Sequence, residues 1–573
     1  MPVQPLPESH PQPHRAALCL NGMWQFKSDA DEDWTEIRVP GAYAGIRQSW
    51  AGERWDTFDY PERWQDKGAT YRRTVRLPDA FRDKAQVRFQ CNGCYHHGAI
   101  RVNGTAVGEW HDGYAIHDYR IDHLLHDGDN EIEVVVSARE SDLFDDYRQF
   151  SRGIWQDCFL YGYGETVIER DVFVTTSVAN GELRCQARIT NTAAADRDVC
   201  LCAVVHDVDG REVLVRQGAV CRVPAAGAAT TECVAAWADA RLWFPHDPHL
   251  YRLTLELRDA GGAVVDTTAL RFGFREITWQ GPHLYLNGEE LFLRGHGGHY
   301  QCDIQGSRAY MQAWLTGLRR EGVNFMRLHD SPKHECLYDV ADEVGMLLEA
   351  EPVHHFHVPA DAAVWQAHME AFLKRYRNRP SVVLWSVSNE LRWNGGGEHP
   401  ELIAFTKRFD TTRPVFSSDF SLESTAGDVL GHHYNPKTCF EEWQEYGPDK
   451  AMIWDELGSV WQPSRPLDDG TAGYEYTSQD YATGCWYDGH DQVLTDLQGV
   501  HDGKTFAGEL HRVNAYCVWD LAYNFFRWQP YNNNQLLELQ HDDLTGPGIK
   551  NKHVRPCSTT FNPWDPTLPV YEP

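Results

Sequence analysis

The chain has 573 residues, too many for one hydrophobic core, and its length suggests about three or four domains. The formal net charge of −30 argues against a nucleic-acid partner, because phosphate binding needs a basic face. No apolar run reaches the roughly eighteen residues that a membrane-spanning helix needs, so none is predicted.

The cysteines and the N-terminus favour a reducing compartment. The 15 cysteines are odd in number and scattered, and the close pairs are Cys91/Cys94 and Cys200/Cys202. We interpret CNGC as structural, because no second pair or histidine cluster stands at a zinc-like distance. The Pro-rich stretch 1–17 lacks the apolar segment of a signal peptide. We therefore expect reduced thiols in a cytoplasmic protein, although removal of a secretion signal would leave the same pattern.

Two all-β domains are predicted first. In 1–166, runs such as YRRTVRL, QVRFQC, AIRVNG and NEIEVVVSA are separated by turn signals, which is typical of an antiparallel sandwich. In 167–277, runs such as DVFVTTSV, ELRCQARIT, CLCAVVHDV and LYRLTLELRD predict a second, immunoglobulin-like sandwich. The low-charge stretch VPAAGAATTE (223–232) is interpreted as a turn within it.

From 278 to 573 short apolar strands alternate with helical patterns such as RAYMQAWLTGLRREG and AVWQAHMEAFLKRYRNRP. This alternation predicts a (β/α)8 TIM barrel. The eight strands are expected at 291–296, 324–329, 346–352, 382–390, 414–420, 429–435, 451–458 and 515–520.

Polar residues gather at the carboxyl ends of these strands, which form the active rim of such barrels. Two of them, Glu390 on the fourth strand and Glu456 on the seventh, would face each other across the mouth. Hydrolysis of a glycosidic bond needs such a pair, one acid to protonate the leaving oxygen and one carboxylate to attack the anomeric carbon. A retaining mechanism requires the two carboxyl groups to lie about five ångströms apart. The alternative for either residue alone is a buried ion-pair partner.

The stretch RNRPSVVLWSVSNE resembles the acid/base signature of glycoside hydrolase family 2, which contains β-galactosidases, β-glucuronidases and β-mannosidases. The resemblance extends along almost the whole chain. LNGMWQF and SRGIWQDCFLYG look like the family's N-terminal jelly-roll domain, RLWFPHDPHLY followed by FGFREI like the end of its immunoglobulin-like domain, and LYLNGEELFLRGHGGH like the opening of its barrel. It implies a jelly roll over 1–166, an immunoglobulin-like sandwich over 167–277 and a catalytic barrel over 278–573.

The resemblance also implies roles for individual residues. Glu390 matches the general acid/base and Glu456 the nucleophile, although Asp455 is a rival because the family usually has no acid beside the nucleophile. The matching substrate contacts are Asn389 at the sugar's 2-hydroxyl, Arg327 and Tyr434 beside the nucleophile, Trp519 on the subsite floor, and His299.

Three departures bear on the choice of sugar. Asp330 stands where the family has a substrate-binding histidine, and Asp146, with Asp145, is slightly out of register with a subsite aspartate of some members. Glucuronidases hold the sugar carboxylate with Asn-x-Lys, whereas this chain has Asn551-Lys552-His553.

The metal ligands of some galactosidases have no clear match, so we expect no required metal and no cofactor. A group of histidines lacks an ordered ligand spacing, and we interpret its members as solvated or hydrogen-bonded: His329, His354, His355, His357 and His433.

The sequence thus predicts a retaining exo-β-glycosidase, most nearly a β-galactosidase, that acts on oligosaccharides or glycosides without a nucleic-acid or membrane partner. A β-glucuronidase or β-galacturonidase is the alternative within the family. A non-catalytic carbohydrate-binding scaffold is the alternative from another class. The sugar, the linkage, the oligomeric state and any continuation beyond Pro573 are left open, and a homo-oligomer is possible.

Overall fold

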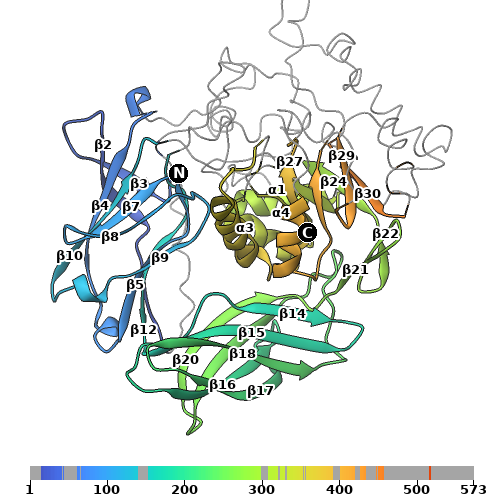
Figure 1. Ribbon diagram of the computed structural model, residues 1–573, viewed down its shortest axis with the longest axis horizontal. Coiled ribbons are helices and arrows are strands. Elements are labelled where there is room, and N and C mark those ends of the chain that lie inside the picture. The colour runs from blue at the N-terminus through green and yellow to red at the C-terminus, as the bar shows by residue number, and fades with distance from the viewer. Residues whose placement is uncertain are drawn as a thin grey trace, which may run out of the picture.

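A computed structural model describes residues 14–41, 43, 61–64, 66–139, 152–297, 308–320, 323–329, 332–352, 354, 357–391, 400–419, 426–433, 445, 447, 449–456 and 515–517. For 62, 294, 296–297, 309–310, 313–314, 454–456 and 515–517 the description covers the backbone alone. It contains two β-sandwiches and a barrel, blue, green and yellow-orange in Figure 1. The predicted fold class, jelly roll, immunoglobulin-like sandwich and TIM barrel, is confirmed. No helix among the described residues is long and apolar enough to cross a membrane.

The N-terminal sandwich packs a four-stranded sheet against a six-stranded one. The first has the order β1 (Ala16–Cys19), β12 (Cys158–Tyr163), β5 (Gln86–Cys91), β9 (His117–Arg120). The second has the order β3 (Thr35–Val39), β2 (Gly22–Ser28), β4 (Ala69–Arg76), β10 (Asp129–Val136), β7 (Gly98–Val102), β8 (Thr105–Trp110). A short pair, β6 (Cys94–Tyr95) and β11 (Gly153–Ile154), completes it.

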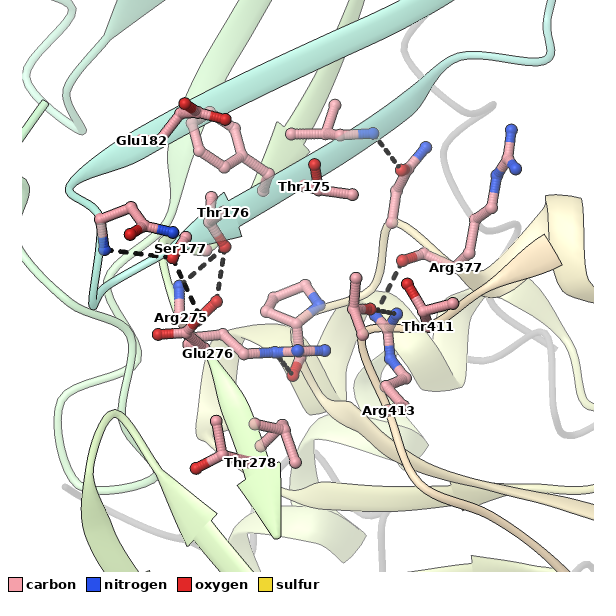
Figure 2. Close-up of a pocket in the computed structure, with 18 of the residues that line it drawn as sticks. Thr175, Thr176, Ser177, Glu182, Arg275, Glu276, Thr278, Arg377, Thr411 and Arg413 are labelled. Carbon is pink, nitrogen blue, oxygen red and sulfur yellow. Dashed lines mark hydrogen bonds between the residues drawn. The ribbon is translucent and has the colours of Figure 1, made fainter. Parts of the chain in front are cut away.

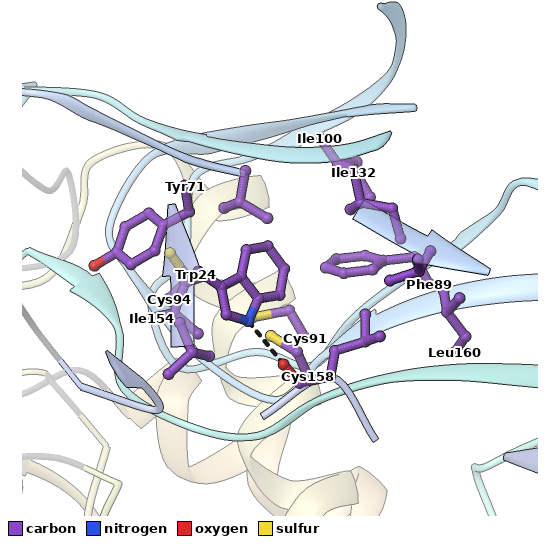
Figure 3. Packing of buried hydrophobic residues seen from close by; sticks show 14 of the residues in the cluster. Trp24, Tyr71, Phe89, Cys91, Cys94, Ile100, Ile132, Ile154, Cys158 and Leu160 are labelled. Atoms are coloured by element: carbon purple, nitrogen blue, oxygen red, sulfur yellow. Dashed lines mark hydrogen bonds between the residues drawn. The ribbon is translucent and has the colours of Figure 1, made fainter. Parts of the chain in front are cut away.

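The core of this sandwich surrounds Trp24, whose Nε1 donates a hydrogen bond to the carbonyl of Leu20 at 2.7 Å (Figure 3). Cys91, Cys94 and Cys158 lie in the same core and are free thiols. Burial raises the pKa of the Cys94 and Cys158 thiols, which keeps them protonated. This agrees with the structural interpretation of CNGC.

The second sandwich also has two four-stranded sheets. One contains β13 (Thr166–Ile168), β14 (Phe173–Ser177), β15 (Glu182–Asn191) and β18 (Gly227–Ala236). The other has the order β17 (Glu212–Val223), β16 (Arg197–His206), β19 (Tyr251–Asp259), β20 (Val264–Phe272).

The predicted turn over 223–232 is wrong, because Val223 still belongs to β17 and β18 begins at Gly227. This strand pairs with β15 over its full length, and Cys233 and Ala235 are buried between the sheets. The side chains of AAGAATT are too small and too weakly hydrophobic to mark a strand by hydrophobic alternation, so pairing with β15 decides the structure there.

A small antiparallel sheet, β21 (Ile277–Gln280), β22 (His283–Leu286) and β23 (Glu289–Leu291), precedes the barrel. The barrel strands are β24 (Leu293–Gly297), β25 (Phe325–Leu328), β26 (Leu347–Ala350), β27 (Val382–Asn389), β28 (Val415–Ser418), β29 (Val429–His433), β30 (Ala451–Glu456) and β31 (Ala515–Cys517). All eight predicted strands are present in one parallel sheet, ordered β28-β27-β26-β25-β24-β31-β30-β29. The backbone N–H of His433 donates to the carbonyl of Asp419 at 2.9 Å, which joins the two ends of this order into a barrel.

Four helices pack on the described part of the barrel: α1 (Arg308–Arg320), α2 (Glu335–Val344), α3 (Ala362–Tyr376) and α4 (Pro400–Phe409). Helix α3 begins after Asp361, whose side chain accepts a hydrogen bond from the N–H of Ala363 at 2.9 Å. Helix α2 ends at Gly345, which has a left-handed φ of 73°.

Each of the three bodies contacts the other two through a buried arginine. The side chains hydrogen-bond as follows: Arg15 to the carboxylate of Asp266, Arg375 to the carbonyls of Asn92 and Tyr114, and Arg275 to the carbonyls of Pro380 and Val382. Helix α3, which carries Arg375, therefore faces the N-terminal sandwich (Figure 1). The arrangement leaves the carboxyl ends of the barrel strands on the side away from the second sandwich.

Candidate active site

The candidate site lies where the carboxyl ends of β25 to β30 meet at one rim. Polar side chains at these ends are almost completely buried although the strands themselves are apolar: Arg327, Glu349, Asn389, Glu390, Ser418, Asp419 and His433. Buried charges and amides are costly unless they are paired or hydrogen-bonded. Their contacts with one another explain how the rim tolerates them.

Glu390 is the first residue after β27 and is 6% exposed. Its φ of 48° lies in the left-handed region, which costs a non-glycine residue roughly 1–2 kcal/mol. Two backbone hydrogen bonds hold this turn, from Glu390 N–H to the carbonyl of Ser418 at 2.9 Å and from Asn389 N–H to that of His354 at 2.7 Å. The bend ends the strand and redirects the chain at the carboxylate.

The carboxylate of Glu390 contacts a histidine from β29. Oε1 of Glu390 lies 2.7 Å from Nδ1 of His433, and Nε2 of the same ring lies 2.7 Å from Oγ of Ser418. His433 is 1% exposed and Ser418 is completely buried. Three adjacent strands, β27, β28 and β29, are thus tied together by one side-chain chain of hydrogen bonds.

A second network centres on Arg327, which is completely buried. Its Nη2 donates to Oδ1 of Asn389 at 2.5 Å and to Oε2 of Glu351 at 3.0 Å, and its Nε lies 3.4 Å from Oε1 of Glu349. Because an arginine can only donate, the oxygen of the Asn389 amide must face it. The Nδ2 group of Asn389 is then directed away, and it has no hydrogen-bond partner among the described residues.

Family comparisons agree with this architecture. Sequence models match the chain over three segments: "Glycosyl hydrolase 2 galactose-binding domain-like" over residues 24–143, "Glycosyl hydrolases family 2" over 166–275, and "Glycosyl hydrolases family 2, TIM barrel domain" over 277–451. The chain belongs to glycosyl hydrolase family 2. The predicted family resemblance is confirmed.

Individual relatives are distant. A β-galactosidase from Priestia megaterium is 24% identical over 79% of this chain, and the chain spans about half of that relative, 49% of its length. Among solved structures, Bacteroides uniformis β-glucuronidase 2 superimposes with a TM-score of 0.69 at 19% identity, covering 88% of this chain and 65% of that one. A β-galacturonidase from Eisenbergiella tayi gives 0.69 at 20% identity, covering 90% of this chain and 91% of that one. These structural matches concern the fold.

The rim of this family 2 barrel brings three of the predicted site residues together, Asn389, Glu390 and Arg327. Glu456 is the last residue of β30, and its backbone is the register partner of His433. The side chain of Glu456 lies outside the described part, so the five-ångström separation from Glu390 stays a prediction. The remaining predicted contacts fall outside the described residues: His299, Asp330, Tyr434, Trp519 and Asp146.

Sequence reasoning missed the partners of the predicted residues. We expected His433 to be solvated or hydrogen-bonded, and it is hydrogen-bonded, but to Glu390 itself. Ser418 and Glu351 were not assigned a role beyond their strand ends. The available signal was position alone, since each of these residues lies within the last three residues of a predicted strand. Among the described residues, no group of three or more His, Cys, Asp or Glu side chains could hold a metal ion.

A separate cavity of about 530 Å³ lies between the second sandwich and the barrel (Figure 2). Its walls include Thr176 and Ser177 of β14, with Arg275 beside them, and Arg413 on the opposite side (Figure 2). Burial, and then the charge of Arg413, lower the pKa of Arg275 well below its usual value. The barrel segments that line this cavity precede their strands, so it opens at the end of the barrel opposite to Glu390.

Proposed function

We propose that this chain is a retaining exo-β-glycosidase that removes terminal sugars from oligosaccharides or glycosides, with a β-galactoside as the leading substrate. The observation that carries the proposal is the group formed by Glu390, Asn389 and Arg327 at the carboxyl rim of a family 2 barrel. The carboxyl group of Glu390 is held in place by His433 of β29, and a carboxyl group fixed in this way is suited to transfer a proton to a leaving oxygen.

In the first step, Glu390 gives its proton to the glycosidic oxygen while Glu456 attacks the anomeric carbon. The bond to the leaving group breaks and a glycosyl ester of Glu456 forms. In the second step, the ionised Glu390 takes a proton from water, the water oxygen attacks the anomeric carbon, and the ester bond breaks to release the sugar and Glu456. Bacteroides uniformis β-glucuronidase 2, which shares the fold, has been captured covalently bound to cyclophellitol-6-carboxylate aziridine, and this supports a covalent intermediate here.

Asn389 assists as a donor to the substrate. Because Arg327 holds the amide oxygen, the Nδ2 group is available to a hydroxyl of the bound sugar, in our proposal the 2-hydroxyl. Hydrogen bonds to this hydroxyl that strengthen in the transition state contribute several kcal/mol to glycoside cleavage, about 2–4. Arg327 therefore acts on the sugar through Asn389.

The sugar itself is the finer part of the proposal. Relatives named β-galactosidases support a galactoside. The fold neighbours named β-glucuronidase and β-galacturonidase support a uronic acid as the second candidate. An enzyme for a uronic acid should hold a Lys or Arg beside the sugar's C6 carboxylate, and Lys552, in the segment 551–553, lies outside the described residues.

A panel of 4-nitrophenyl β-glycosides tests both levels of the proposal. The wild-type chain should release nitrophenol from the galactoside, or else from the glucuronide or galacturonide, and NMR should show that the β-anomer of the sugar forms first. Glu456→Gln should abolish turnover but leave binding of the sugar product, measured by calorimetry. Binding without hydrolysis of any glycoside by the wild type would favour the non-catalytic scaffold. Hydrolysis by Glu456→Gln at the wild-type rate would remove Glu456 as the nucleophile.

A further inference from the structure

His433 and Ser418 form an inner support for the proposed acid/base residue. The imidazole lies between Oε1 of Glu390 and Oγ of Ser418, at 2.7 Å from each, and all three residues are at least nine-tenths buried. The same Ser418 accepts the backbone hydrogen bond of Glu390, and the backbone of His433 donates to Asp419. Glu390 and His433 are therefore both held to the end of β28 and the residue that follows it.

We propose that His433, oriented by Ser418, is a positioning residue that keeps Oε1 of Glu390 an acceptor and so confines the transferable proton to Oε2. This inference rests on the proposed acid/base role of Glu390.

The argument follows from the two nitrogens of a neutral imidazole, one of which donates while the other accepts. When the Ser418 hydroxyl donates to Nε2, the ring proton must be on Nδ1, and Nδ1 then donates to Oε1 of Glu390. Oε1 accepts this hydrogen bond both when Glu390 is protonated on Oε2 and when it is ionised. The acid/base residue can pass through both steps of the cycle without any movement of the ring.

The opposite tautomer would place the carboxyl proton on Oε1, against the ring, where no substrate oxygen can reach it. Proton transfer contributes about 10²–10⁴-fold to such reactions, and an error of about 1 Å in position can cost about 100-fold. As the donor to Nε2 in this proposal, the hydroxyl of Ser418 acts through the ring on which carboxyl oxygen reacts, although it is remote from the substrate.

Several other charged groups surround the pair. Arg327 of β25 reaches the pair through Asn389 and is itself paired with Glu349 of β26 and with Glu351, which follows β26. Asp419, which follows β28, and His432 of β29 flank the pair. Glu456 is the register partner of His433 on β30. These groups are identical in all His433 variants. A comparison between two variants at position 433 thus isolates the ring's own hydrogen bond.

The experiment compares His433→Asn with His433→Gln. The amide nitrogen of Asn occupies the place of Nδ1, whereas that of Gln occupies the place of Nε2, so Asn alone can still donate to Oε1. The substrates are phenyl and 2,4-dinitrophenyl β-D-galactopyranosides, or the matching β-D-glucuronides or β-D-galacturonides if the panel selects a uronic acid. The phenolate of the first needs a proton to leave, and that of the second does not.

We expect His433→Gln to reduce kcat/KM about 10–100-fold for the phenyl glycoside and less than about threefold for the dinitrophenyl glycoside. His433→Asn should recover the phenyl reaction to within about threefold of wild type. Ser418→Ala should show the same leaving-group pattern with a smaller loss.

Equal losses on both substrates, or an Asn variant as slow as the Gln variant, would overturn the inference and indicate ordinary structural damage. If His433→Gln does not fold, as judged by circular dichroism and thermal melting, the Ser418→Ala and His433→Asn pair carries the test in the same way. Glu390→Gln, measured on the same two substrates, separates the proposed acid/base role of Glu390 from the positioning role of His433. If Glu390→Gln loses far more activity on the phenyl than on the dinitrophenyl glycoside but His433→Gln does not, only the role of His433 is rejected. If Glu390→Gln shows no such difference between the two substrates, the acid/base role of Glu390 and this inference are both rejected.

Discussion

Arg327 donates a hydrogen bond from Nη2 to Oδ1 of Asn389 at 2.5 Å, which joins β25 to β27 across the intervening β26. The same guanidinium group lies beside the carboxylates of Glu349 and Glu351, and all of these side chains are buried. Removal of the arginine would leave carboxylates without their cation inside the barrel, which typically costs about 3–5 kcal/mol.

We therefore expect Arg327→Met to lower the free energy of unfolding by about 3–5 kcal/mol in urea titrations followed by tryptophan fluorescence. The matched control is Arg184→Met, which removes the exposed ion pair with Glu232 and should cost less than about 1 kcal/mol. Similar losses in the two variants would show that the buried network contributes no more than a surface pair.

Gly431 in β29 packs directly against β28. A Cβ atom at this position would lie 2.5 Å from Cε2 of Phe416, closer than side chains can approach. Gly431→Ala should move β29 away from Ser418 and so displace His433, with about tenfold or greater loss of kcat/KM and a stability cost of about 1–3 kcal/mol. Steady-state kinetics and thermal melting measure both effects.

Gly164→Ala is the matched control, because its nearest neighbour would be the carbonyl of Val265 at 3.9 Å. It should stay within about 0.5 kcal/mol of wild type and keep full activity. If Gly431→Ala kept wild-type activity and stability, close packing of β29 against β28 would not be what holds His433 in place.

The buried ring of His117 in the N-terminal sandwich leads us to expect a loss of stability in mild acid. Burial lowers the pKa of His117 to about 4, against the opposing effect of nearby Asp112, and its ring stacks on Trp110 at 4.6 Å. The unfolded chain binds the proton from about pH 6.5 downward, whereas the native chain resists it until about pH 4. The contribution of neutral His117 to the free energy of unfolding is therefore fully present above pH 6.5. It is lost as the pH drops toward 4, by on the order of 3 kcal/mol.

Melting temperatures measured between pH 7.5 and 4.5 should fall less steeply for His117→Phe, which keeps an aromatic ring against Trp110 but cannot take up a proton. The same substitution at exposed His126 serves as the control and should keep the wild-type slope, because that ring is not buried on folding. A slope unchanged by His117→Phe would assign the acid sensitivity to other groups, such as the pair of Asp112 with His368.

Most of the architecture could be predicted because its signals are local. The stretch 382–390 was predicted as a strand from its largely apolar start, VVLW, and its polar end, Asn389-Glu390, and the observed β27 (Val382–Asn389) is one residue shorter. The region 223–232 was mispredicted because its Ala, Thr and Gly residues carry little hydrophobic contrast, and β18 forms by pairing with β15. Tertiary pairing overrides weak local propensity in such segments.

The site was predictable to the level of positions but not of contacts. Strand ends identified Arg327, Asn389 and Glu390 as neighbours on one rim, since all parallel strands of a barrel deliver their carboxyl ends to the same side. The contact between Glu390 and His433 spans 43 positions in sequence and depends on the closure of β28 against β29. A histidine at a strand end has several ordinary environments, so residue type alone did not specify this partner.

The three interdomain arginines limit how the chain can be dissected. A fragment cut to begin at β21 would lack Arg275, whose guanidinium holds the carbonyls of Pro380 and Val382 at the start of β27. Glu390 directly follows the other end of β27, so truncation would remove contacts that hold the strand on which the position of the reactive carboxylate depends. Shortened enzymes and grafted barrels made from this chain should accordingly retain the second sandwich, and variation is better introduced by point substitution at the rim.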